Sequence, residues 1–237
     1  NPYLLWMFLN VYGELGHIPG NRGGLFDEFV FQLLKREGLT RGDSPNDGGK
    51  RLSGLLEDLA WKLQSQAAAE AGESGCGAEL TLPRADAVAL LGDEQSLHRA
   101  ASANLLEDAE SVRFTHQLLQ EYFSARRLLT EIGNGLGPDA FWPPERWWEA
   151  SGWEEAVVLA AGFSAEAAGT VFHWVLPANP EVATACIRRS GMAFDDETRL
   201  ALRSNWLDVL TDPKAQPELA RAAIGRALAL DHGGHLV

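Results

Sequence analysis

The sequence predicts a mainly α-helical protein with one small β-hairpin. Leu and Ala fill most apolar positions, while Ile occurs only four times in 237 residues, and unbranched or small side chains favour helix over strand. Few stretches alternate apolar and polar residues with the period of two that marks a half-buried strand. Turn-forming Gly, Pro, Asn and Asp instead separate blocks of helical length along most of the chain.

Residues 1–40 predict a helical domain. Asn1 followed by Pro2 is typical of a helix start, because Asn caps the free backbone N–H groups and Pro fits the first helical position. We expect this helix to reach about Glu14 and a turn-rich connector to follow over 17–24. Apolar residues spaced by three and four then predict an amphipathic helix over 25–37. By composition, residues 38–51 are expected to form a loop.

Residues 41–132 predict a second domain. The elements expected there are a helix over about 52–70, a short extended segment at 79–82, helices over 83–91 and 94–104, a hairpin from 105–106 and 112–114, and a helix from His116 to about Ile132 capped by Thr115. A strand, two helices, a hairpin and a further helix in this order indicate a winged-helix fold.

Residues 133–237 predict a helical repeat region. Residues 133–144 are rich in Gly and Pro and are expected to form a linker. Five blocks of helical length follow, separated by turn signals, at 145–162, 164–176, 179–190, 195–210 and 215–230. Tandem helices of this length are typical of HEAT-like or armadillo-like repeats, although no repeat is visibly self-similar here.

Acidic residues outnumber basic ones by 33 to 20, so the formal charge is −13. Binding to nucleic acid or to an anionic membrane surface needs the opposite balance. The excess concentrates in residues 42–150, which hold 18 acidic and 9 basic residues. The helix that would enter a DNA groove, 94–104, offers only His98 and Arg99 as basic groups. We therefore expect no nucleic-acid binding.

The location predicted from the sequence is the cytoplasm, without a membrane anchor. The longest apolar runs, 3–9 and 156–163, are too short to span a bilayer, and no basic segment precedes the first of them as in a signal peptide. Cys76 and Cys186 form neither a disulfide framework nor a metal motif. The chain lacks an initiator Met, so we expect it to be part of a longer protein.

Catalytic motifs are scarce. The sequence contains no phosphate-binding loop of the Gly-x-x-x-x-Gly-Lys-Ser/Thr type and no dinucleotide-binding fingerprint. The glycine-rich stretch 20–24 has no preceding strand and is expected to be a plain loop. His232 and His235 make an incomplete metal site, since zinc takes three or four protein ligands. Each cysteine is expected to be an inert thiol. The chain itself is thus predicted to be no enzyme and to hold no metal.

Five aromatic residues gather within thirteen positions. If exposed, they would be able to stack on a sugar or a base; if buried, they would hold the linker against the first helical pair. Tryptophan is mostly buried in folded proteins and large aromatic side chains dominate core energetics. We therefore favour burial for Phe141, Trp142, Trp147, Trp148 and Trp153.

His116 stands at the predicted start of a strong helix. Unsatisfied backbone N–H groups and the positive end of the helix dipole meet there, and with an imidazole donor they would form an anion site suited to a phosphate oxygen. A single His in such a place also fits a purely structural role. The pattern of residues alone leaves both interpretations open.

Two stretches resemble a known family. Phe114-x-His116-x-x-x-Gln120-Glu121-Tyr122-Phe123-x-Ala125 resembles the end of the winged-helix domain in NACHT-containing signalling NTPases of the STAND class. The helical domain that follows their nucleotide-binding core is similar to residues 1–5, 11–12, 18–22, 25–26 and 35–37. The two signatures occur in the family's order, cover about residues 1–130, and are most similar to bacterial members.

The resemblance implies an ATP/ADP switch, with Mg, in a longer parent protein. Pro2 would lie against the adenine and His116 would contact the β-phosphate of ADP, which makes these two the implied cofactor-binding residues. Loss of that contact would permit opening and oligomerisation in signalling or antiphage defence. The Walker A and Walker B motifs are missing, so this chain alone is expected neither to hydrolyse ATP nor to bind it well. Implied partners are an upstream nucleotide-binding domain and other proteins or further copies of the chain.

The function expected from the sequence is therefore regulatory. The chain would be the portion of a bacterial NACHT-type NTPase that follows the nucleotide-binding core and couples nucleotide state to conformation. The alternative is a helical-repeat scaffold that binds proteins without sensing nucleotide, in which His116 is merely packed.

Overall fold

Helices dominate the computed structural model, which describes residues 2–40, 47–74 and 80–211. These residues form ten α-helices and one three-stranded antiparallel sheet. The prediction of a mainly helical chain with a small β-hairpin is confirmed. Cys76, the block 215–230, and His232 with His235 lie outside the described residues.

The N-terminal helices are α1 (Pro2–Leu15), α2 (Arg22–Thr40) and α3 (Asp47–Ser74). α1 agrees with its prediction. The predicted loop over 38–51 is wrong at both ends, because α2 continues to Thr40 and α3 already begins at Asp47. α2 also begins earlier than predicted, since the Asn21 side chain accepts the backbone N–H of Gly24 and caps the first turn. Glycine at the start of α2 and at both ends of the loop predicted over 38–51 favours loop over helix, so local composition did not predict these helix ends.

The middle of the chain forms the sheet and the helices around it. Its elements are β1 (Leu82–Pro83), α4 (Arg84–Leu91), α5 (Glu94–Ser102), β2 (Leu106–Asp108), β3 (Ser111–Phe114) and α6 (Gln117–Gly133). The strand order is β1-β3-β2, with Leu82 opposite Val112 and Leu106 opposite Phe114. The predicted order of strand, two helices, hairpin and helix is found.

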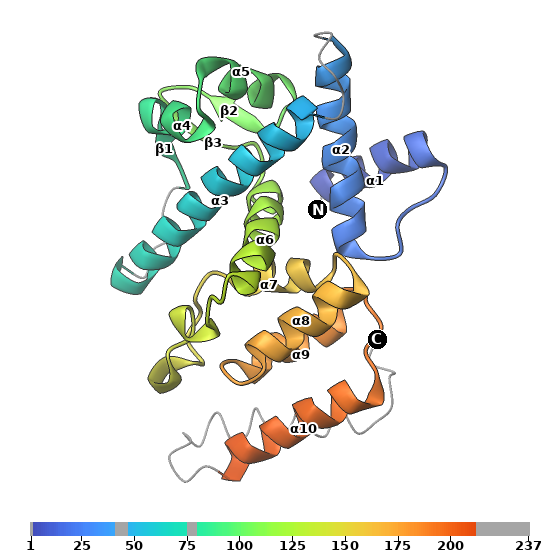
Figure 1. Cartoon of the computed structure of the whole chain (residues 1–237), viewed down its shortest axis with the longest axis vertical. Helices are drawn as coiled ribbons and strands as arrows, with labels where there is room; N and C mark the ends of the chain where they lie inside the picture. Colours follow the sequence, from blue (N-terminus) through green and yellow to red (C-terminus); the bar gives the residue numbers. More distant parts are fainter. Residues whose placement is uncertain (1, 41–46, 75–79, 212–237) are drawn as a thin grey trace.

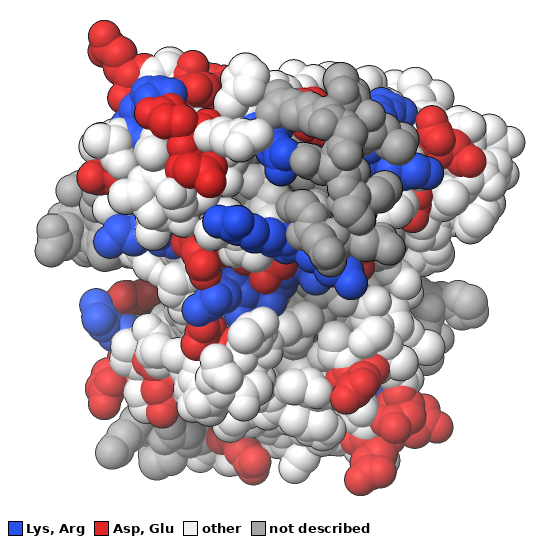
Figure 2. Space-filling model, turned by 45° about the horizontal axis from the view of Figure 1, so that its top comes forward, with Lys and Arg blue, Asp and Glu red and all other residues white. Residues whose placement is uncertain are grey.

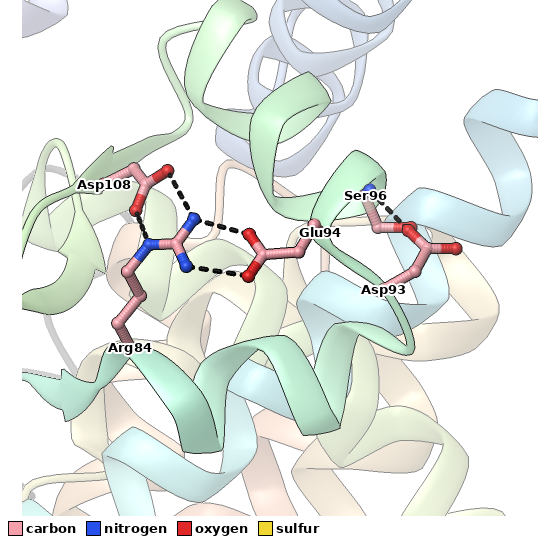
Figure 3. Close-up of polar contacts among 5 residues, drawn as sticks. All are labelled: Arg84, Asp93, Glu94, Ser96 and Asp108. Atoms are coloured by element: carbon pink, nitrogen blue, oxygen red, sulfur yellow. Dashed lines mark hydrogen bonds and ion pairs between the residues drawn. The ribbon is translucent and has the colours of Figure 1, made fainter.

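Ion pairs on the surface tie α4, α5 and β2 together (Figure 3). The Arg84 guanidinium donates to both carboxylate oxygens of Glu94 and to Asp108, with 2.8 Å between Nε and Oδ1 of Asp108. The hydrogen bond to Glu94 and then that to Asp108 raise the pKa of Arg84. At the start of α5 the Asp93 side chain accepts the backbone N–H of Ser96 and caps the helix. The charge of Arg84 is thus shared between two carboxylates.

The C-terminal helices are α7 (Glu154–Ala161), α8 (Ala165–Val175), α9 (Pro180–Arg189) and α10 (Asp196–Thr211). They pack in succession, and α7 also contacts α9. The predicted helix over 145–162 is wrong in its first half, where only a short 3-10 turn, Pro144–Arg146, is helical. Gly152 has φ +81°, which breaks the helix, and the Glu154 side chain accepts the backbone N–H of Ser151. α7 therefore starts at Glu154.

Helix α6 lies in the middle of the molecule (Figure 1). It packs against α3 on one side and α7 on another, and it also contacts α8 and β3. All residues from Leu119 to Ala125 are buried, including Gln120, Glu121 and Ser124. Buried apolar side chains from Met7 to Trp206 form one continuous cluster around it. α6 therefore links the N-terminal and C-terminal helices into a shared core, and α2 adds a direct contact with α7.

Charged side chains join the helices around α6. Arg126 donates to Asp27 of α2 at 2.8 Å and to Glu57 of α3 at 2.9 Å, and the hydroxyl of Tyr122 donates to Asp27 at 2.7 Å. Figure 2 shows Lys and Arg side chains gathered across the middle of one face, with Asp and Glu among them.

Over residues 2–40, 47–74 and 80–211, no helix is both long and apolar enough to cross a membrane.

Candidate functional site

His116 is the N-cap residue of α6. Its backbone is extended, and its Nδ1 accepts the backbone N–H of Leu118 at 3.1 Å. The prediction that Thr115 caps this helix is therefore wrong. The Thr115 hydroxyl donates instead to the carbonyl oxygen of Asn104 at 2.8 Å. Thr115 thus fastens the hairpin, and the next residue takes the capping position.

The capping bond fixes which nitrogen of His116 carries the proton. Because Nδ1 accepts a hydrogen bond, the neutral ring holds its proton on Nε2. Partial burial lowers the pKa of His116, which favours this neutral form near pH 7. No described residue forms a hydrogen bond with Nε2. The ring therefore offers one N–H donor at the start of α6.

The start of α1 lies directly against this histidine. The Tyr3 ring stacks on the His116 ring, with 4.1 Å between centroids and 12° between planes. Tyr3 also meets Phe29 of α2 edge-on, and burial raises the pKa of its hydroxyl. Pro2 is exposed in the same turn of α1 as Tyr3. The two elements that carry the sequence-predicted site residues, more than a hundred positions apart, therefore meet.

An uncovered apolar face of α1 lies beside this junction. Leu5, Leu9 and Tyr12 are 61%, 63% and 56% exposed, and their spacing of four and three places them on one side of the helix. Trp6 is exposed to 41%. Met7 and Val11, on the other side of α1, are fully buried. α1 is thus apolar on both sides, and only one side is covered by the described residues.

The aromatic cluster of residues 141–153 is packed rather than presented to solvent. Trp142 and Trp153 are buried, and Phe141 contacts Trp61 of α3 and Trp174 of α8. The Trp174 Nε1–H donates to the carbonyl oxygen of Leu136 at 2.7 Å. Burial of this cluster, which the sequence favoured, is confirmed for Trp142 and Trp153. The cluster holds the linker against α3 and α8.

Other candidates from the sequence do not assemble into a site. Burial raises the pKa of the Cys186 thiol to about 12, so it stays protonated near pH 7. Asp195 caps α10 by accepting the backbone N–H of Thr198. Within the described ranges, no three His, Cys, Asp or Glu side chains are grouped so that they could hold a metal ion.

Sequence reasoning missed two features near α6. The prediction of a plain loop over the glycine-rich stretch 20–24 is wrong for residues 22–24, which begin α2. This stretch also makes a backbone contact, since a Cβ on Gly23 would lie 2.5 Å from the carbonyl oxygen of Gly162. Glu121 is buried although its charge would ordinarily place it at the surface. A carboxylate between apolar residues of the stretch 118–125, which also contains Gln120 and Ser124, was the available signal for the second feature.

Comparison with models of protein families finds no match to this chain, and comparison with curated proteins finds none either. The resemblance to NACHT-type NTPases thus depends on the residues quoted for it.

Proposed function

We propose that this chain is the regulatory portion of a NACHT-type STAND NTPase. In this proposal residues 1–40 end its helical domain, 41–132 form its winged-helix domain, and 133–237 form HEAT-like repeats. The observation that carries the proposal is the stacking of Tyr3 on His116. It joins the turn that contains Pro2 to the histidine for which the family resemblance implies phosphate contact.

The chemistry at the start of α6 suits a phosphate oxygen. The Nε2–H of His116 is a donor without a described partner, and the N-terminus of α6 adds the positive end of its dipole. A neutral imidazole donates through Nε2 without first taking up a proton, so the contact does not depend on acidic pH. The ADP and Mg would belong to the parent protein, whose nucleotide-binding domain supplies the remaining contacts.

Such a contact couples nucleotide to conformation. A ligand shifts an equilibrium only through interactions that differ between the two states. ADP held jointly by the first turn of α1 and by His116 would favour the arrangement in which α1 and α6 stay together. Loss of the contact would favour separation of these elements and, in the parent protein, exposure of surfaces for oligomerisation.

The exposed face of α1 supplies a surface for the upstream domain. Leu5, Leu9 and Tyr12 form an apolar strip, and a contiguous strip of this kind indicates a protein interface. The nucleotide-binding domain is the partner we propose for it, because the strip begins beside the junction of Tyr3 and His116.

The test compares ADP retained by the intact parent protein with and without His116→Ala. A hydrogen bond to a charged phosphate contributes about 1.5–3 kcal/mol, so the variant is expected to release ADP about 10-fold to 100-fold faster and to activate more readily. His98→Ala, an exposed histidine on α5, is the matched control. Unchanged ADP retention and unchanged activation in His116→Ala would refute the switch.

The same observations favour one alternative, a protein-binding helical scaffold without nucleotide sensing. The Nδ1 cap and the Tyr3 stack already give His116 a structural role. In that case His116→Ala lowers the melting temperature without changing ADP retention. The two readouts therefore separate the two functions.

A further inference from the structure

Glu121 is a buried carboxyl group with half of its hydrogen-bonding capacity unused. The residue is 7% exposed. Its Oε1 accepts a hydrogen bond from the Gln117 side chain at 2.9 Å, whereas its Oε2 is buried and has no hydrogen-bond partner among the described residues. Desolvation raises the pKa of Glu121 to about 7. The neutral acid is therefore substantially populated near neutral pH, which is unusual for a glutamate.

Charges from three other helices act on Glu121. Glu155 of α7 raises its pKa further, while Arg22 of α2 and Arg189 of α9 lower it. Both arginines, however, are bound to Glu155, with 3.3 Å from Arg22 Nη1 and 2.7 Å from Arg189 Nη2 to the Oε2 of Glu155. Glu155 thus takes both cations, and Glu121 has no ion-pair partner of its own among the described residues.

The other charged groups on the helices around α6 are engaged elsewhere or exposed. On α7 Glu154 accepts the backbone N–H of Ser151, and on α3 Lys50, Arg51 and Lys62 are exposed. Glu57 and Asp58 of α3 bind Arg126 and Arg127, respectively, and Asp27 of α2 binds Tyr122 and Arg126. Arg113 of β3 binds Glu107. Glu166 and His173 of α8 are exposed. None of these groups provides Glu121 with a counter-charge.

The helices around Glu121 meet with little room for adjustment. Backbone atoms of Gly23, at the start of α2, lie against Gly162 at the end of α7, and a Cβ on Gly23 would lie 2.5 Å from the Gly162 oxygen. Gly191, just after α9, has φ +80° and lies against Asn21, whose Cα would be 3.1 Å from an added Cβ. The segments that carry Arg22, Glu155 and Arg189, the three groups whose charges act on Glu121, therefore meet by direct backbone packing at this junction of α2, α6, α7 and α9.

We propose that Glu121 is a proton-sensitive latch at the junction of α2, α6, α7 and α9. When Glu121 is protonated, its neutral side chain is tolerated in the closed junction. When the proton leaves to solvent, a buried carboxylate with one unsatisfied oxygen faces Glu155, and opening of the junction allows water to hydrate it. The closed form binds the proton more tightly than the open form, so opening is favoured as pH rises. The latch does not depend on nucleotide sensing.

Hydrogen–deuterium exchange of the whole chain tests the latch at the backbone segments 20–26 and 160–164. A pKa of about 7 in the closed form and 4.5 in the open form predicts that the opening equilibrium rises about tenfold from pH 6 to pH 8, beyond the intrinsic change in exchange rate. Glu121→Gln keeps the shape of the neutral acid and is expected to remove this rise. Glu166→Gln, the same change on the exposed start of α8, is expected to keep it.

The latch is refuted if Glu121→Gln shows the same tenfold rise as the wild type, or if the wild type shows no rise. Glu155→Gln provides a second variant, because loss of the neighbouring negative charge lowers the pKa of Glu121 and should reduce the rise between pH 6 and 8. An equal or larger rise in Glu155→Gln contradicts the proposal. A carbon NMR titration of the Glu121 carboxyl should give a midpoint near 7, and a midpoint near 4.5 overturns it.

Discussion

Two ionisable residues on α6 are both shifted toward their neutral forms. Burial lowers the pKa of His116 and raises that of Glu121, because desolvation disfavours whichever form is charged. The first residue presents a donor at the end of the helix, and the second lies in the interior about one turn farther along. The start of α6 thus combines a neutral group that we propose to bind phosphate with a neutral group that we propose to respond to pH.

Gly23→Ala tests the backbone contact between α2 and the end of α7. The new Cβ would meet the backbone of Gly162 and Phe163, neither of which is a flexible side chain, so the helices must move apart. We expect a loss of about 1–3 kcal/mol in the free energy of unfolding, measured by chemical denaturation.

Gly54→Ala is the control for this prediction. Gly54 lies inside α3, and outside the backbone of its own helix no atom of the described residues is within 4 Å of its added Cβ. Alanine is the better helix former, so this variant is expected to be as stable as the wild type or up to about 1 kcal/mol more stable. If Gly23→Ala is no less stable than Gly54→Ala, the contact has no energetic role.

At the scale of residues, the sequence predicted the position of His116 at a helix start but not the burial of Glu121. The start of α6 follows from local signals, because a hairpin precedes it and apolar spacing follows. Burial of Glu121 depends on elements that are distant in sequence, since α6 packs against α3 and α7. A single amphipathic pattern assigns one face of α6 to the core, whereas in the structure every residue of α6 from Leu119 to Ala125 is buried.

At the scale of elements, the existence of helices was predictable and their ends were not. The loop predicted over 38–51 and the helix predicted over 145–162 both failed, because the deciding interactions involve side chains or turns that composition does not reveal. One such interaction links α3 and α6 to the turn before α7. The Gln64 side chain donates to the carbonyl oxygen of Gly152 at 2.6 Å and accepts from Gln120 at 2.8 Å.

Gln64→Leu should break this link. The substitution leaves the Gln120 amide and the Gly152 carbonyl without their partners, and an unsatisfied buried polar group costs about 1–3 kcal/mol. We expect a destabilisation of that size by thermal or chemical denaturation. Gln66→Leu, on the same helix and only partly buried, is the matched control. Equal stability of the two variants would show that the link contributes nothing.

At the scale of the whole molecule, one continuous apolar cluster extends from α1 to α10. The predicted division into domains at residues 40 and 132 stays a prediction. Because α6 packs against both α3 and α7, the segments on either side of residue 132 share a core. Sequence periodicity predicts which side of each helix is apolar. It does not specify which helix covers that side, and on α1 it gives no distinction between the covered and the exposed apolar sides.

The exposed side of α1 leads to a prediction for the whole molecule. In the double variant Leu5→Ser, Leu9→Ser the lost side chains are already more than half exposed, so the melting temperature of this chain should change little. In the intact parent protein, the same variant should release ADP faster if α1 docks on the nucleotide-binding domain.

Leu200→Ser is the control, since Leu200 is 62% exposed on α10, away from α1 in sequence. It should alter neither quantity. A double variant that retains ADP as the wild type does would show that the apolar side of α1 is not the docking surface.

The contact of Gly23 with Gly162 also has a mechanical consequence. Two helices that meet through main-chain atoms have no compressible layer of side chains between them, so a tilt of α2 would pivot about this contact. α2 extends 19 residues from a point next to the contact, which at 1.5 Å per residue is a length of about 28 Å. A tilt of about 10° about the contact would move the far end of α2 by about 5 Å. A small rearrangement around Gly162 would thus be amplified along the whole length of α2.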